Sequence, residues 1–148
     1  MLVKTLSDAP ERSFAVVLDP GEEAVASLLT FARDYGVTAG RFTGLGAFSG
    51  VTLGFFDPDK KDYDRIEIHE QVEVVNLTGN FATQGAEARV HPHAVVSKRD
   101  GTAWGGHLLE GHVRPTLEVM VTIDPVRLQR HTDPETGLPL LNLASGGD

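Results

Sequence analysis

Apolar residues recur at three- and four-residue spacing in one part of the chain. The run follows 19–23, Asp-Pro-Gly-Glu-Glu, which combines a cap, a proline and early acidic residues typical of a helix start. Gly36 stands where a helix stop is expected. The pattern predicts one helix between these signals, with an apolar face of Ala24, Val25, Leu28, Leu29, Ala32 and Tyr35.

Most of the remaining chain alternates apolar and polar residues, as strands with one buried face do. We expect a tight turn at Ser49-Gly50 between two of these strands, and a bulge or break at Glu70 within another. The result is an α+β fold, a mostly antiparallel β-sheet with one main α-helix packed on it. The predicted strands cover 14–18, 41–47, 51–56, 65–75, 87–97 and 113–123.

The end of the chain differs from the rest. Residues 125–148 are interrupted by prolines and glycines, yet Leu138, Leu140, Leu141 and Leu143 are too apolar for a freely solvated tail. We expect this tail to pack on a sheet edge or on a neighbouring subunit. The chain is then a single domain, 1–148, with its core over about 13–124.

Composition excludes several classes of protein. The chain has 148 residues, 41% of them apolar, an ordinary value for a globular domain. Because cysteine is absent, disulfides and thiolate metal ligands are excluded, and a cytoplasmic location is easily accommodated. Residues 1–10 lack the apolar run of a secretory signal, and no segment reaches the run of about 18 apolar residues of a membrane helix.

The charge balance disfavours nucleic acid as a partner. The formal net charge is −8, from 21 acidic and 13 basic residues. Binding to phosphates needs local positive charge, and its free energy scales with the number of phosphates neutralised. The densest basic positions, Lys60-Lys61 and Lys98-Arg99, are short and lie near acidic residues, so we interpret them as solvated turns.

Two histidines occupy alternate positions of the strand predicted over 87–97. Residues i and i+2 of a strand lie on one face, so His91 and His93 are expected to project together from the polar face. Paired neutral imidazoles are a common beginning of a zinc-type site. An ordinary pair of surface histidines gives the same pattern, and both interpretations stay open.

A third histidine joins the pair only in one register of the next hairpin, whose turn is marked by Asp100-Gly101. A two-residue loop turns His107 away from His93. A three-residue loop pairs Lys98 with Thr102 and sets His107 directly across from His93, with Cβ atoms about 4.5–5.5 Å apart. All three rings then reach one metal ion.

Other residues modify this hypothesis. Gly105-Gly106 would change the register if it added a bulge. Glu110 and His112 are candidate partners of the ligands, or ordinary solvated side chains; His69 and His131 have no partner pattern and are expected at the surface. Three imidazoles leave one position of a tetrahedral ion open to water or a small anion, which favours a catalytic or exchangeable site.

Several blocks of the sequence occur in a recognisable order over roughly 13–123. They are Gly44–Phe48, Glu73–Asn80, His91–His93, Asp100-Gly101, Gly105–Leu108, Glu110-Gly111 and Thr116–Val119. In this combination they resemble the PPC domain, also called DUF296, a domain found in plants and prokaryotes. The tail segment 133–138 is similar to tails of bacterial members.

The resemblance implies a homotrimer in which His91, His93 and His107 bind zinc or another divalent transition metal. A metal-binding protein is therefore the main expectation. The first alternative is a DNA-binding regulatory protein, because prokaryotic members often carry that label; the Arg-Gly-Arg core of an AT hook is absent here. The second is a metal-dependent hydrolase or lyase, with Glu73, Glu110 and Glu118 as candidate general bases by their place in the family blocks.

Overall fold

The computed structural model describes residues 1–8 and 10–143, and it is mostly β-sheet with one short helix. This agrees with the predicted class; β1 lies outside the predicted strands. Among the described residues, no helix has the length and apolar character needed to cross a membrane. The elements are β1 Leu2–Asp8, β2 Arg12–Leu18, α1 Ala24–Asp34, β3 Gly40–Asp57, β4 Asp62–Ile68, β5 Val72–Gln84, β6 Glu87–Ser97, β7 Ala103–Ile123, β8 Gln129–Thr132 and β9 Pro139–Asn142.

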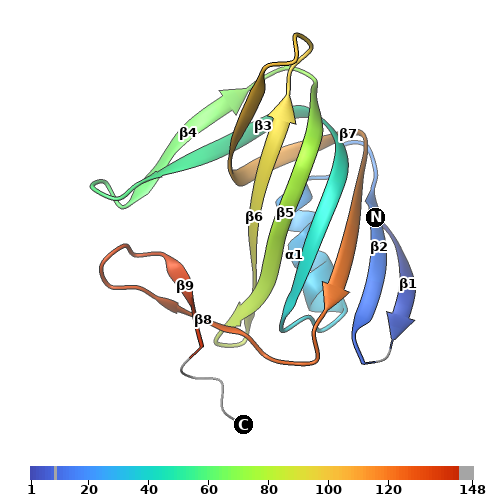
Figure 1. The fold of residues 1–148 in the computed structure, drawn as a ribbon, viewed down its shortest axis with the longest axis vertical. Coiled ribbons are helices and arrows are strands. Elements are labelled where there is room, and N and C mark those ends of the chain that lie inside the picture. Colours follow the sequence, from blue (N-terminus) through green and yellow to red (C-terminus); the bar gives the residue numbers. More distant parts are fainter. Residues whose placement is uncertain (9, 144–148) are drawn as a thin grey trace.

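Two long strands, β3 and β7, change partners along their length. β3 pairs with β7 from Gly40 to Gly54, and it also pairs with β5 in its first part and with β4 in its second. β7 pairs with β6 through its first residues and with β2 through its last. Because β6 also pairs with β5, the four strands β3, β5, β6 and β7 form a closed cycle (Figure 1).

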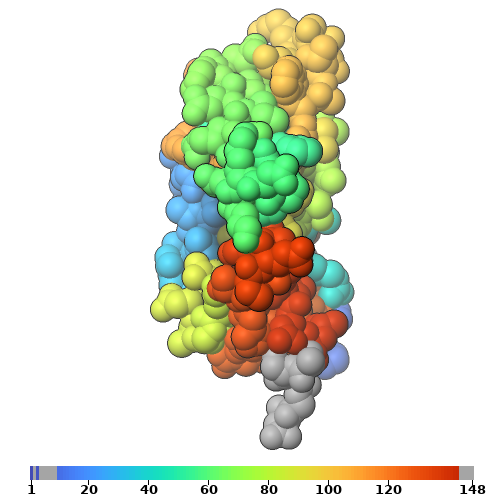
Figure 2. Space-filling view, turned by 90° about the vertical axis from the view of Figure 1, so that its left-hand side faces the viewer, coloured from blue at the N-terminus to red at the C-terminus, as the bar shows by residue number. Residues whose placement is uncertain are grey.

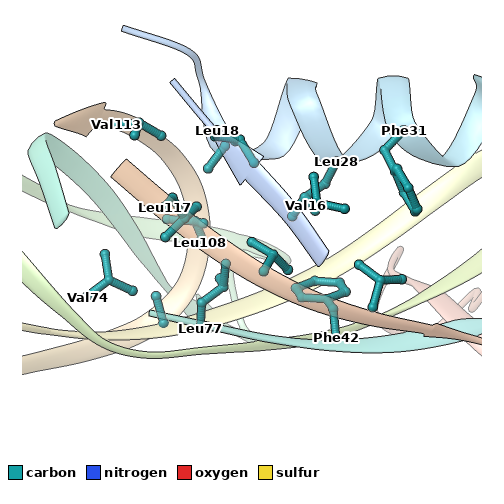
Figure 3. Close-up of a cluster of buried hydrophobic side chains, with 14 of the residues drawn as sticks. Val16, Leu18, Leu28, Phe31, Phe42, Val74, Leu77, Leu108, Val113 and Leu117 are labelled. Atoms are coloured by element: carbon teal, nitrogen blue, oxygen red, sulfur yellow. The ribbon is translucent and has the colours of Figure 1, made fainter. Parts of the chain in front are cut away.

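The helix closes one side of the core. Glu23 is its N-cap, since the Glu23 carboxylate accepts from the N–H groups of Val25 and Ala26 at 3.0 and 2.7 Å. Glu22 and Glu23, the acidic residues expected early in the helix, lie just before its first residue, Ala24. Leu28 and Phe31 are fully buried and face the strands beneath (Figure 3). Burial of each such side chain contributes about 1.5–3 kcal/mol.

The tight turn predicted at Ser49-Gly50 is wrong, because β3 continues through it. The register with β7 shifts between Gly46 and Phe48 and again before Gly50, so the strand bends instead of reversing. Gly46 allows close approach to β7, since a β-carbon there would lie 2.2 Å from the carbonyl oxygen of Thr116. The break predicted at Glu70 is confirmed between β4 and β5.

The described part of the tail forms a hairpin of β8 and β9. β8 joins the sheet beside β5, where Thr83 donates its N–H and its hydroxyl to the carbonyl of Leu128, at 2.8 and 3.0 Å. This hairpin and the β3–β4 hairpin project on the same side of β6 and lie next to each other (Figures 1 and 2). Residues 144–148 of the predicted tail lie outside the described residues.

Substitution of Gly46 with alanine tests the role of the bend. The new methyl group meets the backbone of β7, which has no side-chain freedom to give way, so we expect a loss of about 1–3 kcal/mol in the free energy of unfolding. Gly50→Ala is the matched control in the same strand, because the nearest atom to its β-carbon is 3.5 Å away. Urea unfolding followed by circular dichroism measures the stability of both variants. Equal destabilisation by Gly46→Ala and Gly50→Ala would contradict the role of Gly46 in the close approach to β7.

Candidate metal centre

The β6–β7 hairpin has the three-residue turn on which the predicted site depends. The Lys98 N–H donates to the carbonyl of Thr102, and the Gly101 N–H donates to the carbonyl of Lys98, each at 2.9 Å. Gly101 has a φ of +83°, a conformation that glycine adopts without steric cost. In the resulting register His93 lies directly across from His107.

Three imidazole rings therefore converge. The ring centroids of His91 and His93 are 5.0 Å apart, and each lies 5.3 Å from the centroid of His107. Nε2 of His91 and Nε2 of His93 are 3.1 Å apart, and one ligand atom from each of the three residues lies within 4.8 Å of the others. Two nitrogens bound to one tetrahedral zinc ion are roughly 3.4 Å apart, given bonds of about 2.0–2.1 Å, so the donor set fits one ion.

The surroundings favour the neutral form of two of the three rings, His91 and His107. Burial lowers the pKa of His107 to about 4, with further lowering by the neighbouring charges of His91 and His93. The pKa of His91 is also lowered, first by burial, then by Arg130 and then by His93. Neutral imidazole is the form that binds metal. Nδ1 of His107 is buried without a hydrogen-bond partner among the described residues, a cost that an ion or a ligand would remove.

Tyr63 completes one wall of the cluster, although it lies outside the strands predicted from the sequence. Its ring stacks on that of His107, with centroids 4.8 Å apart and an interplanar angle of 25°. Gly54 makes room for it, because a β-carbon at that position would lie 2.7 Å from Cδ1 of Tyr63. A glycine within an apolar strand is the sequence signal that points to such a close approach.

Gly105-Gly106 do not form the bulge that would have changed the hairpin register. The pairing of β6 with β7 continues through both residues without a register shift. A β-carbon at Gly106 would lie 2.7 Å from the carbonyl oxygen of Gly54, so this glycine allows β7 to approach β3 closely.

The second residue that sequence reasoning missed is Arg130, in β8. Its side chain is buried, and it lines the same pocket as His91 and His107 together with residues of β9. No local pattern in the tail distinguishes Arg130 from a surface arginine. Its position depends on how the β8–β9 hairpin packs.

Other candidate residues lie elsewhere. Oε1 of Glu110 is 2.8 Å from Nε2 of His112, and both line a separate hollow. Glu73 pairs in register with Ser97, and Glu118 pairs with Leu45. The structure therefore does not bring the three candidate general bases to the histidine cluster. His69 and His131 are exposed, as predicted.

Comparison with solved structures gives the fold and its relatives. A Bacteroides thetaiotaomicron protein, provisionally named as DNA binding, is 28% identical with a TM-score of 0.87, covering 97% of this chain and 99% of its own. A Ralstonia eutropha JMP134 protein with the same provisional name is 34% identical, with a TM-score of 0.82 and coverage of 88% and 90%. The metal-containing protein AF0104 of Archaeoglobus fulgidus is 30% identical, with a TM-score of 0.81 and coverage of 88% and 92%.

Comparison with curated proteins adds one relative. The bifunctional protein GlmU of Synechococcus sp. (strain JA-3-3Ab) is 33% identical over 129 residues, which are 85% of this chain. The chain spans about a fifth of that protein, since 20% of its length is covered. Residues 6–123 match the family described as the Plants and Prokaryotes Conserved (PCC) domain. Because this match covers most of the sequence, the chain belongs to the PCC family, which is the family called PPC in the sequence analysis.

Proposed function

We propose that this protein is a metal-binding PPC-domain protein whose His91, His93 and His107 hold one zinc or other divalent transition ion per chain. The observation that carries the proposal is the convergence of three imidazoles from two paired strands, with ligand atoms within 4.8 Å. The description of AF0104 as metal-containing, at 30% identity, supports it. A bound ion of this kind polarises a carbonyl and lowers the pKa of bound water to about 7.

The three histidines differ in their exposure and in their neighbours. His91 and His107 are half-buried, and His93 is the exposed member of the cluster. Tyr63 restrains the ring of His107 by stacking. Three protein ligands leave a fourth tetrahedral position, which water or a small anion would occupy.

Removal of the exposed ligand tests the proposal. Wild-type protein purified without chelator or nickel resin should hold about one ion per chain, and His93→Ala should lose it on dialysis because two imidazoles bind weakly. His112→Ala is the matched control, an exposed histidine of β7 outside the cluster. Elemental analysis by mass spectrometry measures all three, and unchanged metal content in His93→Ala would refute the site.

We propose also that the chain assembles as a homotrimer. The face of the sheet opposite the core carries exposed apolar side chains from three strands, Leu45, Val75 and Met120, which are 62%, 53% and 51% exposed. Leu45 and Met120 line the same shallow hollow. Exposed apolar surface of this kind is typical of association. The family resemblance supplies the number of copies.

A charge on this face should prevent association. Met120→Glu places a carboxylate where apolar surface would be buried, and the desolvation cost favours the monomer. Val126→Glu is the control, because Val126 is 54% exposed but lies outside the sheet. Sedimentation velocity should show a trimer for wild type and the control, and a monomer for Met120→Glu; a monomeric wild type would contradict the assembly.

DNA association is the second candidate function. Two of the similar structures carry that provisional name, one of them at 34% identity. Charge is the physical argument against it, since the chain carries −8 and one lysine of each short basic position forms an ion pair. Nζ of Lys60 lies 2.7 Å from a carboxylate oxygen of Asp64, and Nζ of Lys98 lies 2.8 Å from one of Glu70.

Salt dependence separates the two functions. A DNA-binding protein that contacts several phosphates loses affinity steeply as salt rises, because condensed counterions are released on binding. From the charge distribution we expect no mobility shift of duplex DNA at low salt, with or without zinc. A shift that weakens steeply between 50 and about 200 mM salt would instead establish DNA association.

A further inference from the structure

The pocket beside the histidines lies between two hairpins. It has a volume of about 270 Å³ and is flanked by Tyr63 of β4 and by Leu138 and Leu140 at β9. The two hairpins that form these walls lie next to each other in Figure 2. His91 and His107 face the pocket, so a molecule held there lies against the candidate metal centre. We call this space the histidine pocket.

Arg130 is a buried cation without a counter-charge in this pocket. Its side chain is 6% exposed, and Nη1 donates to the carbonyl of Pro139 at 2.7 Å while Nη2 donates to Oδ1 of Asn80. Both acceptors are neutral. Nε is buried without a hydrogen-bond partner, and no carboxylate of the described residues forms an ion pair with this guanidinium.

A cation in this position is expensive unless an anion approaches it. Removing a charge from water costs several kcal/mol unless a partner charge and hydrogen bonds compensate. Burial accordingly lowers the pKa of Arg130, although guanidinium stays protonated. Two of its five N–H groups are used by Pro139 and Asn80; of the other three, the one on Nε is buried, which leaves one on each of Nη1 and Nη2 for a ligand.

The charge of the pocket is opposite to that of the protein. The chain carries −8, yet among the described residues the pocket is lined by Arg89 and Arg130 and by no acidic side chain. Arg89 is exposed at the rim, where its Nε donates to Gln84 at 3.0 Å. A positive pocket on an acidic protein concentrates small anions there.

We infer that the histidine pocket binds a small organic carboxylate, with its carboxylate group on Arg130 and its apolar part against Leu138 and Leu140. A planar guanidinium pairs with a carboxylate through two parallel hydrogen bonds. The apolar wall favours an organic acid over inorganic phosphate, because phosphate has no apolar surface to bury against it. The volume is below the range of about 300–1,000 Å³ of drug-sized sites, which limits the ligand to a small acid.

The inference rests on the proposed metal site only for the second end of the ligand. A carboxylate held by Arg130 lies in a space that His91 and His107 also line, so a further donor atom of the ligand can reach an ion held by them. The contact with Arg130 does not require the ion. Metal binding and carboxylate binding can therefore be measured independently.

Butyrate and inorganic phosphate are the probes for the test. Each is titrated into zinc-loaded and metal-free wild-type protein, with binding followed by ¹H–¹⁵N NMR shifts and calorimetry. We expect butyrate to bind both forms, because its one carboxylate is placed on Arg130 and it has no second donor atom for an ion, and we expect phosphate to bind metal-free protein more weakly than butyrate. Arg130→Met should weaken butyrate about tenfold or more, because charge-assisted hydrogen bonds are lost.

Two further variants keep the result interpretable. Arg127→Gln is the control, because Arg127 is exposed and donates to the carbonyl of Gly85 outside the pocket. If Arg130→Met does not fold, Leu140→Ser tests the apolar wall, since it should weaken butyrate and leave acetate unchanged. Leu140 is 45% exposed, so this variant should fold.

The outcomes separate the two proposals. If zinc does not bind, but butyrate binds metal-free protein in a way that depends on Arg130, the metal site alone is contradicted. Zinc that binds while butyrate affinity is equal in wild type and Arg130→Met overturns the carboxylate inference alone. Phosphate binding as tight as butyrate, unaffected by Leu140→Ser, would also overturn it.

Discussion

The register of the β6–β7 hairpin is the constraint on which the candidate centre depends. Side chains alternate between the two faces of a strand, so a slip of one residue would turn His107 away from His91 and His93. The three-residue turn fixes the register through the Lys98–Thr102 hydrogen bond, and Gly101 supplies the left-handed conformation. The closed cycle of strands then holds both sides of the hairpin, because β7 is paired with β3 where it carries His107.

Local patterns predicted the helix and most strands, and they predicted the convergence of three histidines for one of the two turn lengths considered. The period-two alternation and the turn signal at Asp100-Gly101 are both short-range features. The tight turn predicted at Ser49-Gly50 is wrong because β3 stays paired with β7 on both sides of it, and register shifts between Gly46 and Gly50 bend the strand instead of reversing it. That pairing is long-range and carries no local signal. Gly46 allows the close approach of β3 to the backbone of Thr116 in β7.

The remaining parts of the pocket depend on long-range packing and carry no local signal. Tyr63 reaches His107 because β4 folds over Gly54, and Arg130 reaches His91 because the β8–β9 hairpin packs beside β5. These contacts join segments that are distant along the chain. They turn a cluster of imidazoles into a pocket with one positive side and one apolar side, which is the chemistry that a small organic acid would recognise.

X-ray absorption at the zinc edge, on protein loaded with one equivalent of zinc, tests the central claim most directly. The account predicts a first shell with three imidazole nitrogens at about 2.0–2.1 Å and one further light atom, with the multiple-scattering signature of histidine rings. A shell dominated by carboxylate oxygens, or one with fewer than three imidazoles, would place the ion elsewhere and contradict the account.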